Sequence, residues 1–444
     1  MSSSTENGED SGEEEAVAST SRLETRRRVS ASSAARLIAS ANGVWPEPFV
    51  ESLAVNVAME AYNSVGPLAA GPALANLFMV CSTWRSVSTS ETLWRVLCSN
   101  VWGFSTLTRA SWRSEYAFRH RTASNFRNRQ SRHFTLQLEP TSPASTPTCR
   151  RIGLSDRYLA LGFLDGSVRA FDLRTRAHLG SYCPAHSDRL GPYSRAVSGL
   201  VIDNDRLVFA LLDGNVYEGD ISGWVFRRVL AGNVVDNGTC VDFNGNGRFW
   251  VGLFAGVPGR AVRVWDAVTE ETLFVGGDLT DPDAVRGWRL LTEPHRTLGR
   301  VRVGAGGLVV ACTESRVSVV FGAEDEIYES FGDFMVGCFD AHGERCLVVS
   351  RDEEATIRHL PDLNRTCEFE VEGVATNEAL GCMNWTQGFV CSEGVIGTWD
   401  LRSGENLYHF REDLGEATAI VADDLHVAAV TTDALLHLWS FAAL

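Results

Sequence analysis

The sequence predicts a small all-α module followed by an all-β propeller of seven blades, with six or eight blades as alternatives. Apolar residues recur at helical spacing between residues 43 and 132, whereas short strand patterns repeat about every forty residues across 133–444. The chain has 444 residues, of which 44% are hydrophobic, and this is enough to bury more than one core. These observations predict two folded regions of different class.

Composition and charge exclude several kinds of function. All 40 basic residues are arginines, so no lysine amine is present for a Walker A phosphate site or a Schiff base. Residues 133–444 carry 26 arginines against 44 acidic residues, a net charge of −18, which argues against direct nucleic-acid binding. No apolar run is long enough to cross a membrane, and no signal peptide is visible. The 11 cysteines lack paired spacing and predict reduced core residues.

Residues 1–42 are predicted to form a disordered N-terminal tail. Ser, Glu, Ala and Thr dominate this segment, and its few large apolar side chains cannot offset the entropy of an ordered chain. The cluster Arg26-Arg27-Arg28 has the composition of a nuclear localisation element, with a solvated charge run as the alternative.

Residues 43–100 are predicted to form a helical bundle. Trp45-Pro46 places a proline where a helix can begin, because the first helical turn needs no backbone donor. Apolar spacing predicts helices over 51–62, 72–87 and 91–98, with an extended connection across 61–71.

This bundle resembles an F-box. The resemblance rests on Trp45-Pro46 at the start, on Val80-Cys81-Ser82-Thr83-Trp84-Arg85 and on Leu93-Trp94. It implies docking on a Skp1-like protein and, through that protein, membership of a cullin-RING ubiquitin ligase. The residues that it implies in Skp1 binding are Pro46, Phe49, Leu53, Val80, Cys81, Trp84, Leu93 and Trp94. The alternative is that the tryptophans and aliphatic side chains only hold the bundle together.

Residues 101–132 are predicted to form a helical connector. Trp112, Tyr116, Ala123 and Phe126 fall on one helix face, which places the arginines of this segment mainly on the other, solvated sides. Nucleic-acid contact by these arginines is the alternative. The spacing also resembles the helix between F-box and propeller in F-box/WD40 proteins, and this resemblance implies a rigid spacer.

Residues 133–444 repeat a unit of four short strands. Seven residue pairs mark the expected ends of third strands, at spacings of 48, 46, 55, 40, 39 and 40 residues. They are Phe171-Asp172, Gly219-Asp220, Trp265-Asp266, Val320-Phe321, Leu360-Pro361, Trp399-Asp400 and Trp439-Ser440. Trp-Asp at a strand end resembles the WD40 propellers, although the Gly-His pair of that family does not occur in this sequence.

The ring is expected to close through the first strand of this region. One four-stranded sheet cannot cover both of its faces, so each blade needs two neighbours, and a closed circle supplies them. The chain ends with the strand Leu435–Phe441, which leaves the seventh blade one strand short. The alternating strand His133–Leu138 is predicted to supply the missing outer strand, as in WD40 rings.

The hairpins that join second and third strands are expected to gather on one rim, as in WD40 rings. They carry a mostly acidic set that is predicted to hold a basic segment of a target protein. The set is Asp165, Asp213, Arg260, Glu314, Asp352, Glu353, Glu354, Glu393 and Asp433. The alternative is that these residues serve the conformation of the turns and that their charges are solvated.

No catalytic site, metal site or cofactor is predicted. Cys183-x2-His186 and Cys338-x3-His342-x3-Cys346 have metal-like spacing, but zinc needs about four ligands and neither motif has a complementary half-site. The glycine-rich stretches 245–247 and 304–307 lie between strands and not before a helix, so they predict turns. We therefore expect that the chain is not itself an enzyme.

Longer stretches resemble one plant family. VWPEPFVESLAVNVA, PALANLFMVCSTW, FRHRTASNFRNR and FWVGLFAGVPGRAVRVWD are similar to the STERILE APETALA-type F-box/WD40 regulators, and the similarity covers nearly everything from residue 43 onward. The resemblance implies a nuclear substrate receptor of a Skp1–cullin–F-box (SCF) ubiquitin ligase that acts in flower, ovule and organ-size development. It also implies targets among transcriptional repressor assemblies of the PEAPOD and KIX-adaptor kind. A WD40 scaffold or transcriptional co-regulator without ligase function is the alternative, and cytoplasmic residence is also open.

Overall fold

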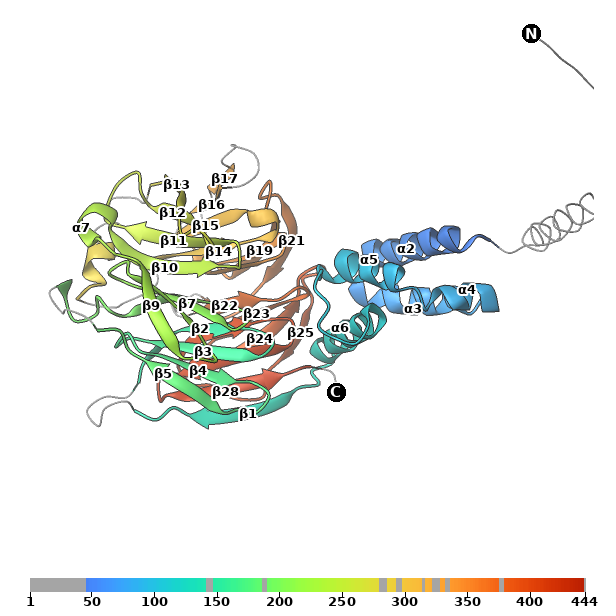
Figure 1. Ribbon diagram of the computed structural model, residues 1–444, viewed down its shortest axis with the longest axis horizontal. Helices are drawn as coiled ribbons and strands as arrows, with labels where there is room; N and C mark the ends of the chain where they lie inside the picture. Colours follow the sequence, from blue (N-terminus) through green and yellow to red (C-terminus); the bar gives the residue numbers. More distant parts are fainter. Residues whose placement is uncertain are drawn as a thin grey trace, which may run out of the picture. The chain divides into compact units, whose positions relative to one another are not determined.

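The chain forms two compact units, residues 1–117 and residues 118–444, which we call the helical unit and the propeller unit and describe separately (Figure 1). The predicted tail 1–42 and the predicted rim residue Glu314 lie outside the described residues. The computed structural model describes residues 45–140, 147–185, 190–278, 286–292, 298–313, 316–321, 328–331, 336–374 and 379–442.

The described part of the helical unit contains four helices and the first turns of another. They are α2 (Glu47–Ser64), α3 (Pro67–Phe78), α4 (Ser82–Val87), α5 (Glu91–Trp102) and α6 (Trp112–Arg127). Pro46 directly precedes α2, as the sequence predicts. Ser90 caps α5, because its Oγ accepts a hydrogen bond of 3.3 Å from the N–H of Leu93. Gly103, with φ 64°, ends this helix in the left-handed conformation.

The extended connection expected across 61–71 is wrong. Helix α2 continues to Ser64 and α3 begins at Pro67, so only Val65 and Gly66 join them. Gly66 has φ 125°, which glycine adopts without steric cost, and the fixed φ of Pro67 suits the first position of a helix. The two helices therefore form a tight antiparallel hairpin.

The single helix expected over 72–87 is also wrong, because two helices share this stretch. Helix α3 ends at Phe78, and Cys81 has an extended backbone with φ −160° and ψ 172° before α4 begins. The apolar spacing continues across the break, which is why periodicity alone predicts one helix. The break leaves Met79 and Val80 outside both helices.

Trp94 lies at the centre of the core of the helical unit. Its ring centroid lies 5.1 Å from that of Tyr116 and 6.2 Å from that of Phe78. The indole N–H donates a hydrogen bond of 2.8 Å to the carbonyl oxygen of Ser88, so its one polar atom is satisfied inside the fold. Leu93 and Leu97 are buried beside it on the same helix.

The described part of the propeller unit consists of seven four-stranded antiparallel sheets, the second half of α6 and a few short helical turns. The strands are β1 (Arg132–Gln137), β2 (Cys149–Leu154), β3 (Tyr158–Phe163), β4 (Val168–Asp172), β5 (His178–Tyr182), β6 (Val197–Asp203), β7 (Arg206–Leu211), β8 (Val216–Asp220), β9 (Val225–Leu230), β10 (Thr239–Gly245), β11 (Phe249–Ala255), β12 (Val262–Asp266), β13 (Thr272–Gly276), β14 (Gly299–Val303), β15 (Val309–Thr313), β16 (Arg316–Phe321), β17 (Tyr328–Phe331), β18 (Val336–His342), β19 (Arg345–Ser350), β20 (Glu354–His359), β21 (Arg365–Glu370), β22 (Leu380–Met383), β23 (Gln387–Ser392), β24 (Val395–Asp400), β25 (Asn406–His409), β26 (Ala417–Ala422), β27 (His426–Thr431) and β28 (Leu435–Ser440). Helix α7 (Val234–Asn237) and the 3-10 turn η2 (Ala305–Gly307) lie between sheets.

The sheets close into a ring, and the prediction of seven blades is confirmed. The first strands β2, β6, β10, β14, β18, β22 and β26 contact one another in this order, and β26 contacts β2. Strand β1 pairs antiparallel with β28 and completes the last blade, where Figure 1 shows the two strands side by side. The predicted closing strand is therefore confirmed, shifted by one residue.

All seven predicted residue pairs lie at or directly after the end of a third strand. The aspartates among them fix the turn to the fourth strand. Asp172 Oδ1 accepts a hydrogen bond of 2.8 Å from the N–H of Thr175, and Asp266 Oδ1 accepts one of 2.8 Å from that of Thr269. Hydrogen bonding by the turn N–H groups lowers the pKa of Asp266. The repeated Asp is thus explained by turn geometry.

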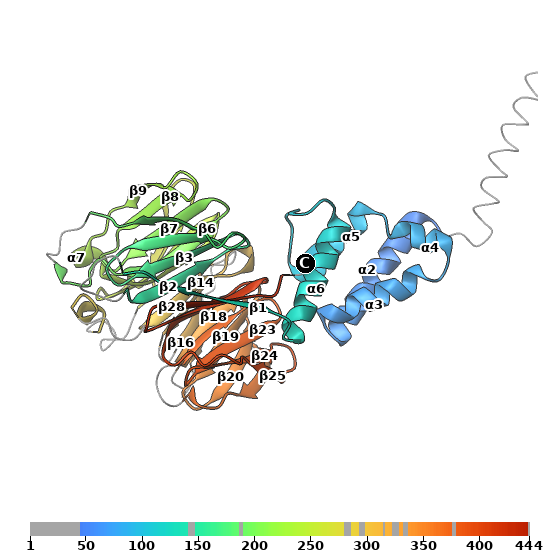
Figure 2. The same ribbon diagram turned by 90° about the horizontal axis from the view of Figure 1, so that it is seen from below.

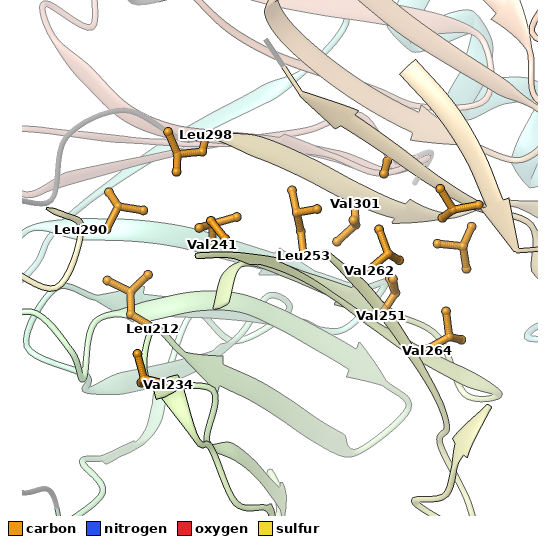
Figure 3. Packing of buried hydrophobic residues seen from close by; sticks show 14 of the residues in the cluster. Leu212, Val234, Val241, Val251, Leu253, Val262, Val264, Leu290, Leu298 and Val301 are labelled. Atoms are coloured by element: carbon orange, nitrogen blue, oxygen red, sulfur yellow. The ribbon is translucent and has the colours of Figure 1, made fainter. Parts of the chain in front are cut away.

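Apolar side chains of neighbouring blades form shared cores. Figure 3 shows Val241 and Leu253 of one blade packed with Val301 of the next. Each of these three side chains is at most 1% exposed. Every blade therefore depends on its neighbours, which is the physical reason for the closed ring.

The second half of α6 packs within the propeller unit. The ring of Phe126 is 1% exposed and stacks on that of Phe441, with 3.9 Å between centroids. Asn125 Nδ2 donates a hydrogen bond of 2.9 Å to the carbonyl oxygen of Phe441. The predicted connector therefore supplies part of the propeller core.

Arg119 departs from the expectation of a solvated helix face. It is 5% exposed, and its guanidinium lies 3.4 Å from a carboxylate oxygen of Asp156 and 3.9 Å from one of Asp424. Both aspartates belong to loops between first and second strands. This arginine therefore serves the propeller fold.

Candidate functional site

Exposed apolar side chains gather at one end of the helical unit. The tight α2–α3 hairpin brings the beginning of α2 to the end of α3, and α4 lies at the same end in Figures 1 and 2. Trp45 is 51% exposed, Phe49 45%, Met79 76% and Val80 62%. We call these four residues the apolar end surface. Contiguous exposed apolar side chains are typical of a protein-binding surface.

Most of the predicted Skp1-binding residues lie on or beside this surface. The exposed ones are Pro46, Phe49, Val80 and Cys81, and the half-buried ones are Leu53 and Trp84. The ring of Phe49 stacks on that of Trp45, with 4.6 Å between centroids and 17° between planes. The stacking restricts both rings, which lowers the entropy that a partner must remove on binding.

Leu93 and Trp94 are exceptions among the predicted contact residues. They are 2% and 7% exposed, and they form the core of the helical unit. A side chain enclosed in this way cannot reach a partner protein. Support of the bundle, the alternative interpretation, therefore explains the place of these two residues in the F-box-like motif.

The hairpins between second and third strands share one rim with the connections from fourth to first strands, because successive strands run antiparallel. We call this side the hairpin rim. Of the predicted set, Asp165, Arg260, Asp352, Glu393 and Asp433 are exposed, Glu353 and Glu354 are half-buried, and Asp213 is buried. Asp213 is 4% exposed, so it cannot meet a target.

Several of these carboxylates are held by their own turns. Asp165 Oδ1 accepts hydrogen bonds of 2.9 Å and 2.6 Å from the N–H and Oγ of Ser167. Asp213 Oδ1 accepts one of 2.9 Å from the N–H of Asn215. Turn conformation therefore explains both aspartates, whereas Asp352 lies exposed on the rim.

The hairpin rim also carries exposed apolar side chains that the sequence does not predict. Val235 of α7 is 76% exposed, Leu190 43% and Trp288 39%. We call these three residues the rim patch. The only signal for it is the 55-residue spacing between Trp265-Asp266 and Val320-Phe321, which marks the extra chain that carries Trp288.

Hydrogen bonds and buried leucines hold the segments of the rim patch together. Leu290 and Leu291 are 3% and 6% exposed. The N–H of Tyr193 donates a hydrogen bond of 3.1 Å to the carbonyl oxygen of Leu291. Arg260 Nη1 donates a hydrogen bond of 3.4 Å to the backbone oxygen of Asp236, the residue that follows Val235. The patch therefore consists of anchored segments with a cation at its edge.

Over the described ranges, no group of three or more His, Cys, Asp and Glu side chains is placed to hold a metal ion. Burial raises the pKa of Cys338 and of Cys346 to about 12, which keeps both thiols protonated, whereas His186 lies outside the described residues. No helix in the described part of the chain is both long and apolar enough to cross a membrane.

Together, the fold and these surfaces define a seven-bladed β-propeller protein with an N-terminal helical unit. The chain is 47% identical over 418 residues to a protein of Arabidopsis thaliana named transcriptional regulator STERILE APETALA, covering 91% of this chain and 93% of that protein. The chain therefore belongs to the STERILE APETALA family.

Two further comparisons add no argument about function. No protein-family model matches the chain. Among solved structures, a computationally designed protein, Ika8, aligns with 67% of this chain and 98% of its own length, at 13% identity and a TM-score of 0.46.

Proposed function

We propose that this protein is the substrate-recognition subunit of an SCF ubiquitin ligase. The helical unit docks on a Skp1-like protein, which links it to a cullin-RING ligase, and the propeller unit binds the protein to be modified. The observation that carries the proposal is the apolar end surface, because it exposes Phe49 and Val80 of the F-box-like motif on a well-packed bundle. Burial of these side chains would stabilise such a complex.

The hairpin rim is proposed to bind the target protein. The rim patch offers apolar contact around Trp288, and exposed acidic residues such as Asp352 favour a target segment that carries basic residues. This chain supplies no catalytic group, since the ligase chemistry belongs to the RING partner. We further propose that the targets belong to transcriptional repressor assemblies of the PEAPOD and KIX-adaptor kind in the nucleus, and that their removal controls flower, ovule and organ-size development. The relative's name, which describes a transcriptional regulator, supports a role in transcription.

The test is capture of the protein from plant cells with the proteasome inhibited, followed by mass spectrometry. The wild-type chain is expected to retain a Skp1-like protein and a cullin, and the double variant Phe49→Asp, Val80→Asp is expected to lose both. Val65→Asp is the matched control, because Val65 is 73% exposed but lies at the α2–α3 turn, at the other end of the hairpin. Equal capture by the double variant and the control would refute the docking surface.

A second function accords with the name of the relative, which describes a transcriptional regulator and not a ligase subunit. In that case the propeller is a scaffold or co-regulator, and the helical unit only accompanies it. Target half-life separates the two functions. A ligase receptor shortens the half-life of a captured protein and the double variant lengthens it again, whereas a scaffold leaves it unchanged in both.

A further inference from the structure

The innermost strands of the propeller hold a cluster of charges that the proposed function does not use. The cluster combines four arginines and two aspartates from strands β2, β10, β14 and β18. We call it the inner-strand cluster: Arg150, Arg151, Asp242, Arg300, Arg302 and Asp340.

Asp242 is shared by three guanidiniums. Its Oδ1 lies 3.3 Å from Arg151 Nε and 3.4 Å from Arg300 Nη1, and its Oδ2 lies 3.1 Å from Arg302 Nη1. The side chain is 1% exposed, and Oδ2 also accepts a hydrogen bond of 2.9 Å from the N–H of Val301. Both oxygens are therefore fully used, and one negative charge faces three positive ones.

Among the described residues, the ion-pair partner of Asp340 is Arg302. Its Oδ1 lies 2.6 Å from Arg302 Nε, and its Oδ2 accepts a hydrogen bond of 2.9 Å from the N–H of Met383. Four positive charges against two negative ones leave the cluster with an excess of two positive charges. Uncompensated charge inside a protein is costly, and a bound counter-ion would remove that cost.

Arg150 and Arg300 are the least compensated members on the solvent-accessible side of the cluster, because Arg300 has only a share of Asp242, at 3.4 Å. Arg150 Nη1 donates a hydrogen bond of 3.3 Å to the carbonyl oxygen of Val197, and the guanidinium makes no ion pair with any described residue. Burial and the positive charge of Arg300 lower the pKa of Arg150 to about 10, which still leaves it charged at neutral pH. The Arg300 side chain is 26% exposed and that of Arg302 18%, so solvent reaches the cluster.

We propose that Arg150 and Arg300 bind a dianionic phosphate group between the innermost strands. A guanidinium presents paired N–H donors that match the oxygens of phosphate, and two negative charges balance the excess. Strand β2 belongs to the first blade and β14 to the fourth, so the anion would tie distant parts of the ring together. The phosphate is either free inorganic phosphate or the head of a small phosphate ester.

Thermal unfolding of the purified full chain tests this site. Inorganic phosphate, added in place of chloride at constant ionic strength, is expected to raise the unfolding temperature of the wild type and of Arg228→Gln. Arg228 is an exposed arginine of outer strand β9, so this variant removes the same charge elsewhere. Arg150→Gln and Arg300→Gln are expected to show no rise, and without phosphate each is expected to be at least as stable as the wild type, because repulsion is relieved.

Titration calorimetry gives an independent readout. Phosphate is expected to bind the wild type about tenfold or more tightly than either cluster variant, since each loses a charge-assisted hydrogen bond. Glycerol phosphate in a parallel titration distinguishes an ester from the free anion. The proposal would be overturned if the wild type bound neither phosphate nor glycerol phosphate. It would also be overturned if phosphate raised the unfolding temperature of Arg300→Gln as much as that of the wild type.

Discussion

Replacement of Phe126 by alanine probes whether the second half of α6 belongs to the propeller fold. The ring is 1% exposed, and its centroid lies 3.9 Å from that of Phe441 and 6.0 Å from that of Phe389. A buried aromatic side chain removes about 200 Å² from water, which corresponds to about 5 kcal/mol as an upper limit. Measured costs of such truncations are about 3–5 kcal/mol, since the cavity only partly collapses.

Scanning calorimetry of the full chain measures this effect. For a folded unit of this size, a loss of about 4 kcal/mol lowers the unfolding temperature of the propeller by about 5 °C. Arg127→Ala is the control, because that side chain is 46% exposed and pairs with Asp400 and Glu405 at the surface, at 3.4 Å and 3.6 Å. Surface ion pairs contribute about 0–1 kcal/mol, so this variant stays within about 1 °C of the wild type. Equal small shifts in both variants would show that α6 does not pack as described.

Two further predictions concern ring closure and helix capping. Burial lowers the pKa of His133 and of His437, whose rings face each other across β1 and β28, with Glu412 beside them. As the pH falls, these histidines take up protons in the unfolded chain before they do so in the folded one. The propeller therefore keeps its full free energy of unfolding above about pH 6.5 and loses part of it below that pH. His437→Gln is expected to flatten the decline of the unfolding temperature with falling pH, and a decline as steep as that of the wild type would contradict this. Ser90→Ala removes the cap of α5 and is expected to cost the helical unit about 1 kcal/mol in urea unfolding, whereas no loss would contradict the capping role.

The sequence predicts the propeller well because its signals are local and repeated. Some blades end their third strand in an aromatic residue followed by Asp, and Trp399-Asp400 or Trp265-Asp266 can be found without knowledge of the rest of the chain. The remaining pairs follow from the spacing of about forty residues between blades. The closing strand follows from counting, since the last blade lacks one strand. Aspartates at the ends of third strands accept hydrogen bonds from the turns that follow them, as Asp266 does from the N–H of Thr269.

The surfaces are less predictable because they depend on contacts between distant segments. A helical pattern gives Leu93 and Phe49 the same apolar character, and only the packing decides that Leu93 is buried and Phe49 exposed. Trp288 lies in a stretch without repeat pattern, so no local signal marks it. Asp242 and Arg302 meet across two blades and 60 residues of sequence, a separation that periodicity cannot detect.

Binding of the purified full chain to a purified Skp1-like protein tests the central claim most directly. Phe49 is 45% exposed, so a partner can cover about 90 Å² of its side chain, which corresponds to about 2 kcal/mol. Titration calorimetry is therefore expected to show binding by the wild type, affinity about thirtyfold weaker in Phe49→Ala, and no change in Val65→Ala. Absence of binding by the wild type, or equal affinities in the two variants, would contradict the proposed docking through the apolar end surface.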